Sequence, residues 1–265
     1  MNKNKGTAEG RQEEKEFVRE INKKENNIIW KKLNLERENH YGIHVSEGQY
    51  SKITGKKVLP KSDVIIGYGK IEKEFLKKNN YYLNLKDFKT FNLNYVLGSG
   101  ISVKRKDSKN YQIHKFTPDA FYRVFNSYQL GAGACIYCLR EEELIKNDNV
   151  LRGWKTSWEN FIEYFKKDFK NVHLLRNCNE DLNNVKILAE KIKNFSVNKI
   201  VKIINNNQYI SNIIFLGKDN FEDPFWANWL YDNGSLKNNR IIPFNVTTGS
   251  GRSRGDFTLV IKPKK

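Results

Sequence analysis

The sequence predicts an α/β protein with a mixed central sheet flanked by helices. Two observations support this fold class. Segments with the spacing of amphipathic helices alternate with short runs of β-branched residues, and no internal repeat or long linker interrupts the pattern. The chain has 265 residues, of which 38% are hydrophobic, so it can form a sizeable core. One domain spanning residues 1–265 is the simplest organisation.

A first helix is expected from Gly10 to about Asn27. Phe17, Val18 and Ile21 form an apolar stripe at helical spacing. Glu14 falls on the same face, where a carboxylate needs a partner. An acid in the first turn is also favoured by the helix dipole alone, so Glu14 is a candidate site residue with an ordinary alternative.

Two β-segments follow. Residues 59–69, LPKSDVIIGYG, combine β-branched residues with closing glycines and predict a strand. A lysine- and asparagine-rich insertion separates this strand from a second one, which is expected from Gly100 to Lys104. Ser102 and Lys104 are two residues apart and therefore face the same side of the sheet. A lysine in that position either covers apolar surface at a sheet edge or serves a function in a pocket.

The second half of the chain predicts helices and a hairpin. In FTPDAFYRVFNSYQLG, Thr117 is the expected N-cap, Pro118 the first helical residue, and Gly131 lies just past the end. The next run, GACIYCL, is short and apolar and predicts a buried strand. Ser157 caps a further amphipathic helix, and EDLNNVKILAEKIKNF predicts another. The C-terminal residues predict two strands around a basic Gly/Ser turn.

The cysteines favour a structural role over a metal site. Cys135, Cys138 and Cys178 could form a zinc site with His173. However, Cys135 and Cys138 lie in the apolar run, where they would diverge on a strand and act as small hydrophobes. The odd number of cysteines, together with the lack of a signal peptide or a run of about 20 apolar residues, predicts a cytoplasmic protein with no membrane association.

The charge of the chain points to a polyanionic partner. Its net charge is +17, with 47 basic and 30 acidic residues. Such an excess favours a polyanion, which could be DNA, RNA or an anionic membrane, and nucleic acid is preferred among these. A coding bias toward lysine and asparagine would explain the many lysines but not the shortage of acids.

Phosphodiester hydrolysis requires a cation to neutralise developing charge and a positioned water. Mg²⁺ takes oxygen ligands, usually one or two carboxylates with substrate phosphate and waters. Asp63 at the start of the first strand, with Ser102 and Lys104 on the second, supplies oxygen ligands and an ammonium group. This pattern is typical of a metal-dependent nuclease.

These residues resemble a known family. Pro60-Lys61-Ser62-Asp63 and Ser102-Val103-Lys104 are similar to the paired motifs of PD-(D/E)XK type II restriction endonucleases, especially the small enzymes that cut four-base palindromes. Tyr111-Gln112-Ile113 and Lys115 stand where that branch carries a Gln-Ile pair. Residues 10–15 resemble its first helix, in which a glutamate leans toward the metal. The resemblance spans roughly residues 10–125.

The resemblance implies a restriction-endonuclease-like fold with a catalytic core at 10–130, and a region at 150–265 whose helices and basic hairpin recognise DNA. It implies a type II site-specific deoxyribonuclease that depends on Mg²⁺, cuts a short palindrome and leaves a 5′-phosphate. Such an enzyme acts as a monomer or homodimer. It belongs to a restriction–modification system, in which a cognate DNA methyltransferase is its genetic partner.

The resemblance also implies residue roles. Asp63 binds the metal together with Glu14 and the main-chain carbonyl of Val103, while Lys104 orients or deprotonates the attacking water and Ser102 completes the site. Ser102 departs from the family pattern, which has Asp, Glu, Gln or Asn there, and a neutral hydroxyl anchors Mg²⁺ less well than a carboxylate does.

A rival second motif is Asp87-Phe88-Lys89, which keeps the acidic residue but lies in the lysine- and asparagine-rich insertion. Lys104 is preferred because its segment has matching neighbours on both sides.

Several residues are expected to contact DNA. They lie after the second strand and in the C-terminal turn, and are Arg105, Lys106, Gln112, Lys115, Arg252, Ser253 and Arg254. The two arginines of the turn could read guanine edges or only contact phosphates. Two other functions remain open: a non-catalytic nucleic-acid-binding protein, and a repair or structure-specific nuclease on the same fold.

Overall fold

The computed structural model describes residues 5–23, 28–45, 47–55, 60–104, 111–137, 141–176, 181–219, 221–248 and 257–264. The chain divides into two compact units, which we call the first unit (1–109 and 211–241) and the second unit (110–210 and 242–265). The predicted single endonuclease domain stays a prediction, because this division assigns no function to either unit.

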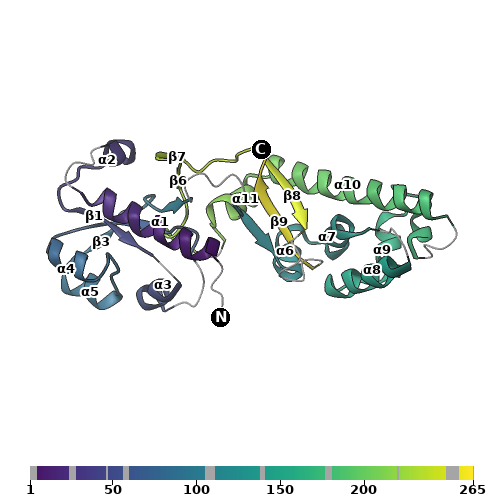
Figure 1. The fold of residues 1–265 in the computed structure, drawn as a ribbon, viewed down its shortest axis with the longest axis horizontal. Helices are drawn as coiled ribbons and strands as arrows, with labels where there is room; N and C mark the ends of the chain where they lie inside the picture. The colour runs from purple at the N-terminus through teal and green to yellow at the C-terminus, as the bar shows by residue number, and fades with distance from the viewer. Residues whose placement is uncertain are drawn as a thin grey trace. The chain divides into compact units, whose positions relative to one another are not determined.

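The first unit contains a mixed six-stranded sheet (Figure 1). Its strands are β1 (His40–His44), β2 (Val64–Tyr68), β3 (Asn94–Tyr95), β4 (Ile101–Val103), β6 (Trp229–Asp232) and β7 (Ser235–Asn238). They follow the order β1-β2-β4-β6-β7, with β3 also paired to β2. The β4–β6 pair is parallel and the other pairs are antiparallel.

Helices flank this sheet. They are α1 (Lys5–Ile21), α2 (Ile28–Leu33), α3 (Glu47–Thr54), α4 (Lys73–Lys78), α5 (Leu85–Thr90) and a π-helical segment, Asn212–Leu216. In β2, Val64 and Ile66 join one hydrophobic cluster, which includes Phe17 of α1, while Ile65 joins another, which includes Phe88 of α5. Successive strand residues face opposite sides, so β2 is buried on both faces over residues 64–67, which are apolar, while Tyr68 at its end is exposed. The predicted mixed sheet flanked by helices is confirmed.

Two glycines permit close packing in the first unit. A Cβ on Gly42 of β1 would lie 2.5 Å from Ile21 Cγ2, so a glycine allows α1 to pack directly on the sheet. A Cβ on Gly100 would lie 1.8 Å from the carbonyl oxygen of Trp226 and 2.2 Å from that of Pro224. The chain therefore enters β4 through a gap that admits no side chain.

The second unit combines a three-stranded antiparallel sheet with helices. The sheet order is β5 (His114–Phe116), β9 (Leu259–Pro263) and β8 (Phe244–Thr248). The helices are α6 (Pro118–Phe125), α7 (Tyr128–Cys135), α8 (Glu141–Gly153), α9 (Trp158–Phe165) and α10 (Leu182–Asn206), with a 3₁₀ helix at Val172–Arg176; α11 (Gln208–Ser211) lies at the boundary of the two units. The two predicted C-terminal strands are β8 and β9, while the turn at 249–256 lies outside the described residues.

The predicted caps of two helices are confirmed. Thr117 Oγ1 accepts a hydrogen bond from the Ala120 N–H at 3.3 Å, ahead of Pro118 at the start of α6. Ser157 Oγ accepts one from the Asn160 N–H, also at 3.3 Å, at the start of α9. The helix predicted from residue 180 is α10, which extends further than the sequence pattern indicated.

The strand predicted at GACIYCL is wrong. Asn126 adopts φ 51° and ends α6, and Ser127 then caps α7, so Gly131 lies inside a helix rather than just past one. A Cβ on Gly131 would lie 2.0 Å from the ring of Trp154. Within the run itself, a Cβ on Gly133 would lie 2.4 Å from Ser196 Oγ. Both glycines allow α7 to pack closely against its neighbours, which the sequence pattern alone does not distinguish from a buried strand.

Among the described helices, none combines the length and apolar character that spanning a bilayer requires.

Candidate active site

The backbone of Asp63 is fixed between β1 and β4 in the first unit. Its N–H donates to the Ile101 carbonyl at 2.8 Å, and its carbonyl accepts from the Val45 N–H at 2.8 Å. Beyond β4, the N–H of Lys104 donates to the Tyr231 carbonyl of β6 at 2.8 Å. The aspartate and the lysine are therefore held by neighbouring parts of one sheet.

The side chains of Asp63, Ser102 and Lys104 form a chain of hydrogen bonds. Lys104 Nζ donates to Ser102 Oγ at 2.7 Å, and Ser102 Oγ donates to Asp63 Oδ2 at 3.2 Å. Asp63 Oδ2 also accepts from the Val103 N–H at 2.7 Å. Because Ser102 and Lys104 are two residues apart on an extended segment, they share one face of the sheet, and that face carries Asp63.

Glu14 reaches the same site from α1 and is held there by a histidine. Its Oε2 lies 3.1 Å from Nε2 of His44, the last residue of β1. The His44 side chain is only 1% exposed, whereas that of Glu14 is 23% exposed. The imidazole stacks on Tyr82 with a centroid separation of 4.5 Å. His44 therefore fixes the orientation of the Glu14 carboxylate.

The electrostatics of Asp63 reflect burial beside a second carboxylate. The pKa of Asp63 is raised to about 6, chiefly because the carboxyl group is buried and in part because Glu14 carries a like charge. The charge of Lys104 and the hydrogen bonds from Val103 and Ser102 act in the opposite direction. A proton or a cation at this point would relieve the repulsion between the two carboxylates.

Lys61 is a second lysine of the site. The pKa of Lys61 is lowered to about 7, chiefly by burial and in part by the positive charge of Lys104, while the charge of Asp63 opposes the shift. The segment at Gly217 packs against Lys61, since a Cβ on Gly217 would lie 2.7 Å from Lys61 Cβ. The site therefore combines two carboxylates with two lysines.

A scan against protein-family models and a search of curated proteins find no match for this chain.

The residues of the site fit Mg²⁺ in their chemistry. Among the described residues, no three His, Cys, Asp or Glu side chains gather closely enough to hold a metal ion by themselves. Mg²⁺ does not require such a cluster, since it usually keeps several waters and binds one or two carboxylates and a substrate phosphate. Asp63, whose pKa is raised by burial and by the nearby charge of Glu14, can supply such a carboxylate. The Val103 carbonyl remains a predicted further ligand.

The rival pair, Asp87 and Lys89, lies on helix α5. Asp87 Oδ2 accepts from the Asn84 N–H at 2.8 Å, and Asn84 Oδ1 accepts from the Asp87 N–H at 3.1 Å. These reciprocal bonds form a capping box, in which the acid stabilises its own helix. Lys89 is exposed in the last turn of that helix. The geometry therefore gives Asp87 a local structural role.

Two of the predicted DNA contacts are described by the structure, and both belong to the second unit. Gln112 and Lys115 are exposed residues of the second unit, and Lys115 lies on β5. The others, Arg105, Lys106, Arg252, Ser253 and Arg254, lie outside the described residues, as do Cys138 and Cys178.

Two residues of the site were not predicted from the sequence. Lys61 belongs to the Pro60–Asp63 motif and stands two residues before Asp63. The period of two in a strand is a signal that places both side chains on one face. His44 offered none, because its partner Glu14 lies on a separate element, and only the packing of α1 against β1 brings the two together.

Proposed function

We propose that this chain is a Mg²⁺-dependent type II restriction endonuclease that cuts double-stranded DNA at a short palindrome. The observation that carries the proposal is the hydrogen-bonded chain from Lys104 through Ser102 to Asp63. The net charge of +17 favours a polyanionic substrate. The mixed sheet flanked by helices is compatible with a restriction-endonuclease-like fold.

In this proposal, Asp63 and Glu14 hold Mg²⁺ with the Val103 carbonyl. When bound, the ion supplies positive charge where negative charge develops on the phosphate oxygens. His44 keeps the Glu14 carboxylate in place, 3.1 Å from its Nε2.

Lys104 orients the attacking water, and Ser102 fixes the ammonium group through the 2.7 Å hydrogen bond. The water oxygen bonds to phosphorus as the bond to the 3′ oxygen breaks. The products are a 5′-phosphate and a 3′-hydroxyl.

The test is digestion of a phage DNA of known sequence by the purified protein, with Mg²⁺ or with EDTA, followed by mapping of the ends. Discrete fragments with 5′-phosphates are expected only with Mg²⁺. DNA methylated by the cognate methyltransferase is expected to resist. Salt-sensitive binding without cleavage would support the non-catalytic alternative, and nicks confined to branches or lesions would support a repair nuclease.

A matched pair of variants tests the site itself. Lys104→Ala should slow cleavage by about 100-fold or more, because the water loses its positioning group. Lys86→Ala removes an exposed lysine of α5 and should cleave at the wild-type rate. Wild-type cleavage by Lys104→Ala would contradict the proposed site.

A further inference from the structure

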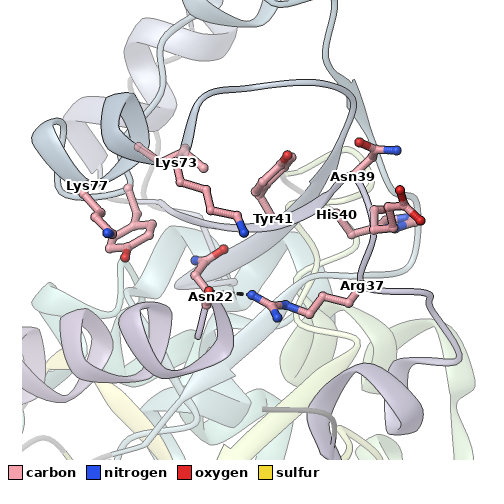
Figure 2. A pocket seen from close by; sticks show the side chains of 10 residues that line it. Asn22, Arg37, Asn39, His40, Tyr41, Lys73 and Lys77 are labelled. Atoms are coloured by element: carbon pink, nitrogen blue, oxygen red, sulfur yellow. Dashed lines mark hydrogen bonds between the residues drawn. The ribbon is translucent and has the colours of Figure 1, made fainter. Parts of the chain in front are cut away.

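A polar pocket of the first unit shares no lining residue with the candidate active site. Its volume is about 540 Å³. Its walls come from the residue after α1, from residues 37–41 at the start of β1, from α4 and from Tyr81 (Figure 2). The volume falls in the range of small-molecule sites, about 300–1,000 Å³.

The lining of the pocket is cationic. Its lining residues include three cations, Arg37, Lys73 and Lys77, and one acid, Glu38. Lys73 extends across the pocket toward Tyr41 and Asn22 (Figure 2). Among the described residues, the Lys73 side chain has no hydrogen bond or ion pair. Its ammonium group is therefore available to an anionic ligand.

Lys77 pairs with Glu74 at 2.9 Å, and both of these side chains are more than half exposed (59% and 82%). Such surface pairs contribute little to stability, so Lys77 can exchange this partner for a ligand anion at small cost.

The wall of the pocket formed by Arg37 and Asn22 is fixed by hydrogen bonds. Arg37 Nη2 donates to the Asn22 carbonyl at 2.9 Å. The Asn22 side chain bridges α1 to β1, since its Nδ2 donates to the Gly42 carbonyl at 2.8 Å and its Oδ1 accepts from the Gly42 N–H at 3.1 Å. A guanidinium group has five N–H donors in a planar fork. Arg37 is thus anchored by one donor and can present others to a phosphate.

Aromatic surface completes the pocket. Tyr41 and Tyr81 are both half-buried and line it. Base stacking on aromatic side chains contributes about 1–3 kcal/mol per base and tolerates any base. Positively charged side chains can bind a phosphate, and aromatic rings beside them can stack on the attached nucleobase.

We propose that this pocket binds a nucleoside phosphate, with the phosphate against Arg37 and Lys73 and the base beside Tyr41. The ligand is either a free nucleotide or one nucleotide of a nucleic-acid strand. The inference rests on the pocket and does not depend on cleavage by the candidate active site.

The experiment measures binding of dAMP, deoxyadenosine and a fluorescent 12-nucleotide single strand to the full chain in EDTA at low salt. The test variant is Lys73→Gln with Lys77→Gln. The control removes the same charge elsewhere in the first unit, through Lys70→Gln with Lys86→Gln, both exposed and outside the pocket. All four lysines are exposed, so the variants should fold, and thermal unfolding checks this.

The test variant should weaken dAMP binding about tenfold or more, because two charge-assisted contacts are lost, while the control pair should change it little. Deoxyadenosine should bind more weakly than dAMP. If dAMP does not bind but the test variant alone weakens strand binding, the ligand is a nucleotide within a strand. The proposal is overturned if both variants weaken binding equally, or if neither weakens it.

Discussion

At the scale of single residues, burial makes the ionised form of Asp63 unfavourable. The carboxyl group of Asp63 holds its proton more tightly in the folded chain than in the unfolded chain, because its pKa rises from 3.8 to about 6 on folding. The stability of the wild type therefore falls as the pH rises from about 4 to about 6, and the loss persists above that window.

Asp63→Asn should therefore abolish Mg²⁺-dependent cleavage yet stabilise the metal-free protein at pH 8, by up to about 3 kcal/mol. The gain should nearly vanish at pH 4. Urea unfolding in EDTA at both pH values measures it. Asp219→Asn, an exposed control in the same unit, should show no such pH dependence. A gain of equal size at pH 4 and pH 8 would refute this explanation.

Burial of the Lys61 charge also destabilises the folded chain, but with the opposite dependence on pH. Below pH 7 its ammonium charge is buried beside Lys104, whereas above pH 7 the folded chain releases a proton that the unfolded chain keeps up to its usual pKa of 10.5. The stability of the wild type should therefore rise between pH 7 and pH 10.5.

Lys61→Met should be more stable than the wild type below pH 7, by about 2 kcal/mol. Its advantage should shrink as the pH approaches 10. Unfolding curves in EDTA at pH 6 and pH 9.5 test this, with Lys86→Met as the exposed control. An advantage that grew with pH would show that burial of the Lys61 charge is not its cause.

At the scale of elements, the contact between α1 and β1 places Glu14 in the site. Gly42→Ala would bring a Cβ to 2.5 Å from Ile21 Cγ2, and because Ile21 is fully buried, we expect α1 to shift. We expect a loss of about 1–3 kcal/mol in the free energy of unfolding, and a larger loss of cleavage, because Glu14 moves with the helix.

Gly48→Ala is the matched control for this change. It lies on α3, and a Cβ there meets nothing within 4 Å. Alanine should stabilise the helix by up to about 1 kcal/mol. Denaturant unfolding of both variants makes the comparison, and similar stabilities would contradict the role given to Gly42.

Some elements could be predicted from local sequence and others could not. The period of two in β4 placed Ser102 and Lys104 on one face, and the caps of α6 and α9 were readable from Thr117 and Ser157. The strand predicted over the end of α7 is wrong, because the glycines there allow close helix packing, Gly131 against Trp154 and Gly133 against Ser196 and Phe165. No local rule distinguishes that use of glycine from a buried strand.

At the scale of the whole molecule, the excess of 17 positive charges should dominate binding to DNA. A protein that contacts 6–10 phosphates loses about 10³–10⁵ in affinity between 50 and 200 mM salt. We expect a loss in this range for a 30-base-pair duplex, measured by fluorescence anisotropy in EDTA. An affinity that does not change with salt would argue against a DNA substrate.

The division into two units was not predictable from the sequence. β6 belongs to residues 211–241 yet pairs with β4, with Ser102 opposite Leu230. Pairing between such distant segments depends on packing of the whole sheet, which composition and periodicity do not encode. The residues of the candidate site could be picked out from the sequence, but the strand pairing that surrounds them could not.

Gly100 has a consequence for protein engineering. The residues that follow it, Ser102 and Lys104, cannot be transplanted as a short cassette, because the entry to their strand is shaped by the carbonyl groups of Pro224 and Trp226. A host scaffold would have to receive the distant loop as well, and a saturation library at position 100 should retain only glycine among its folded members.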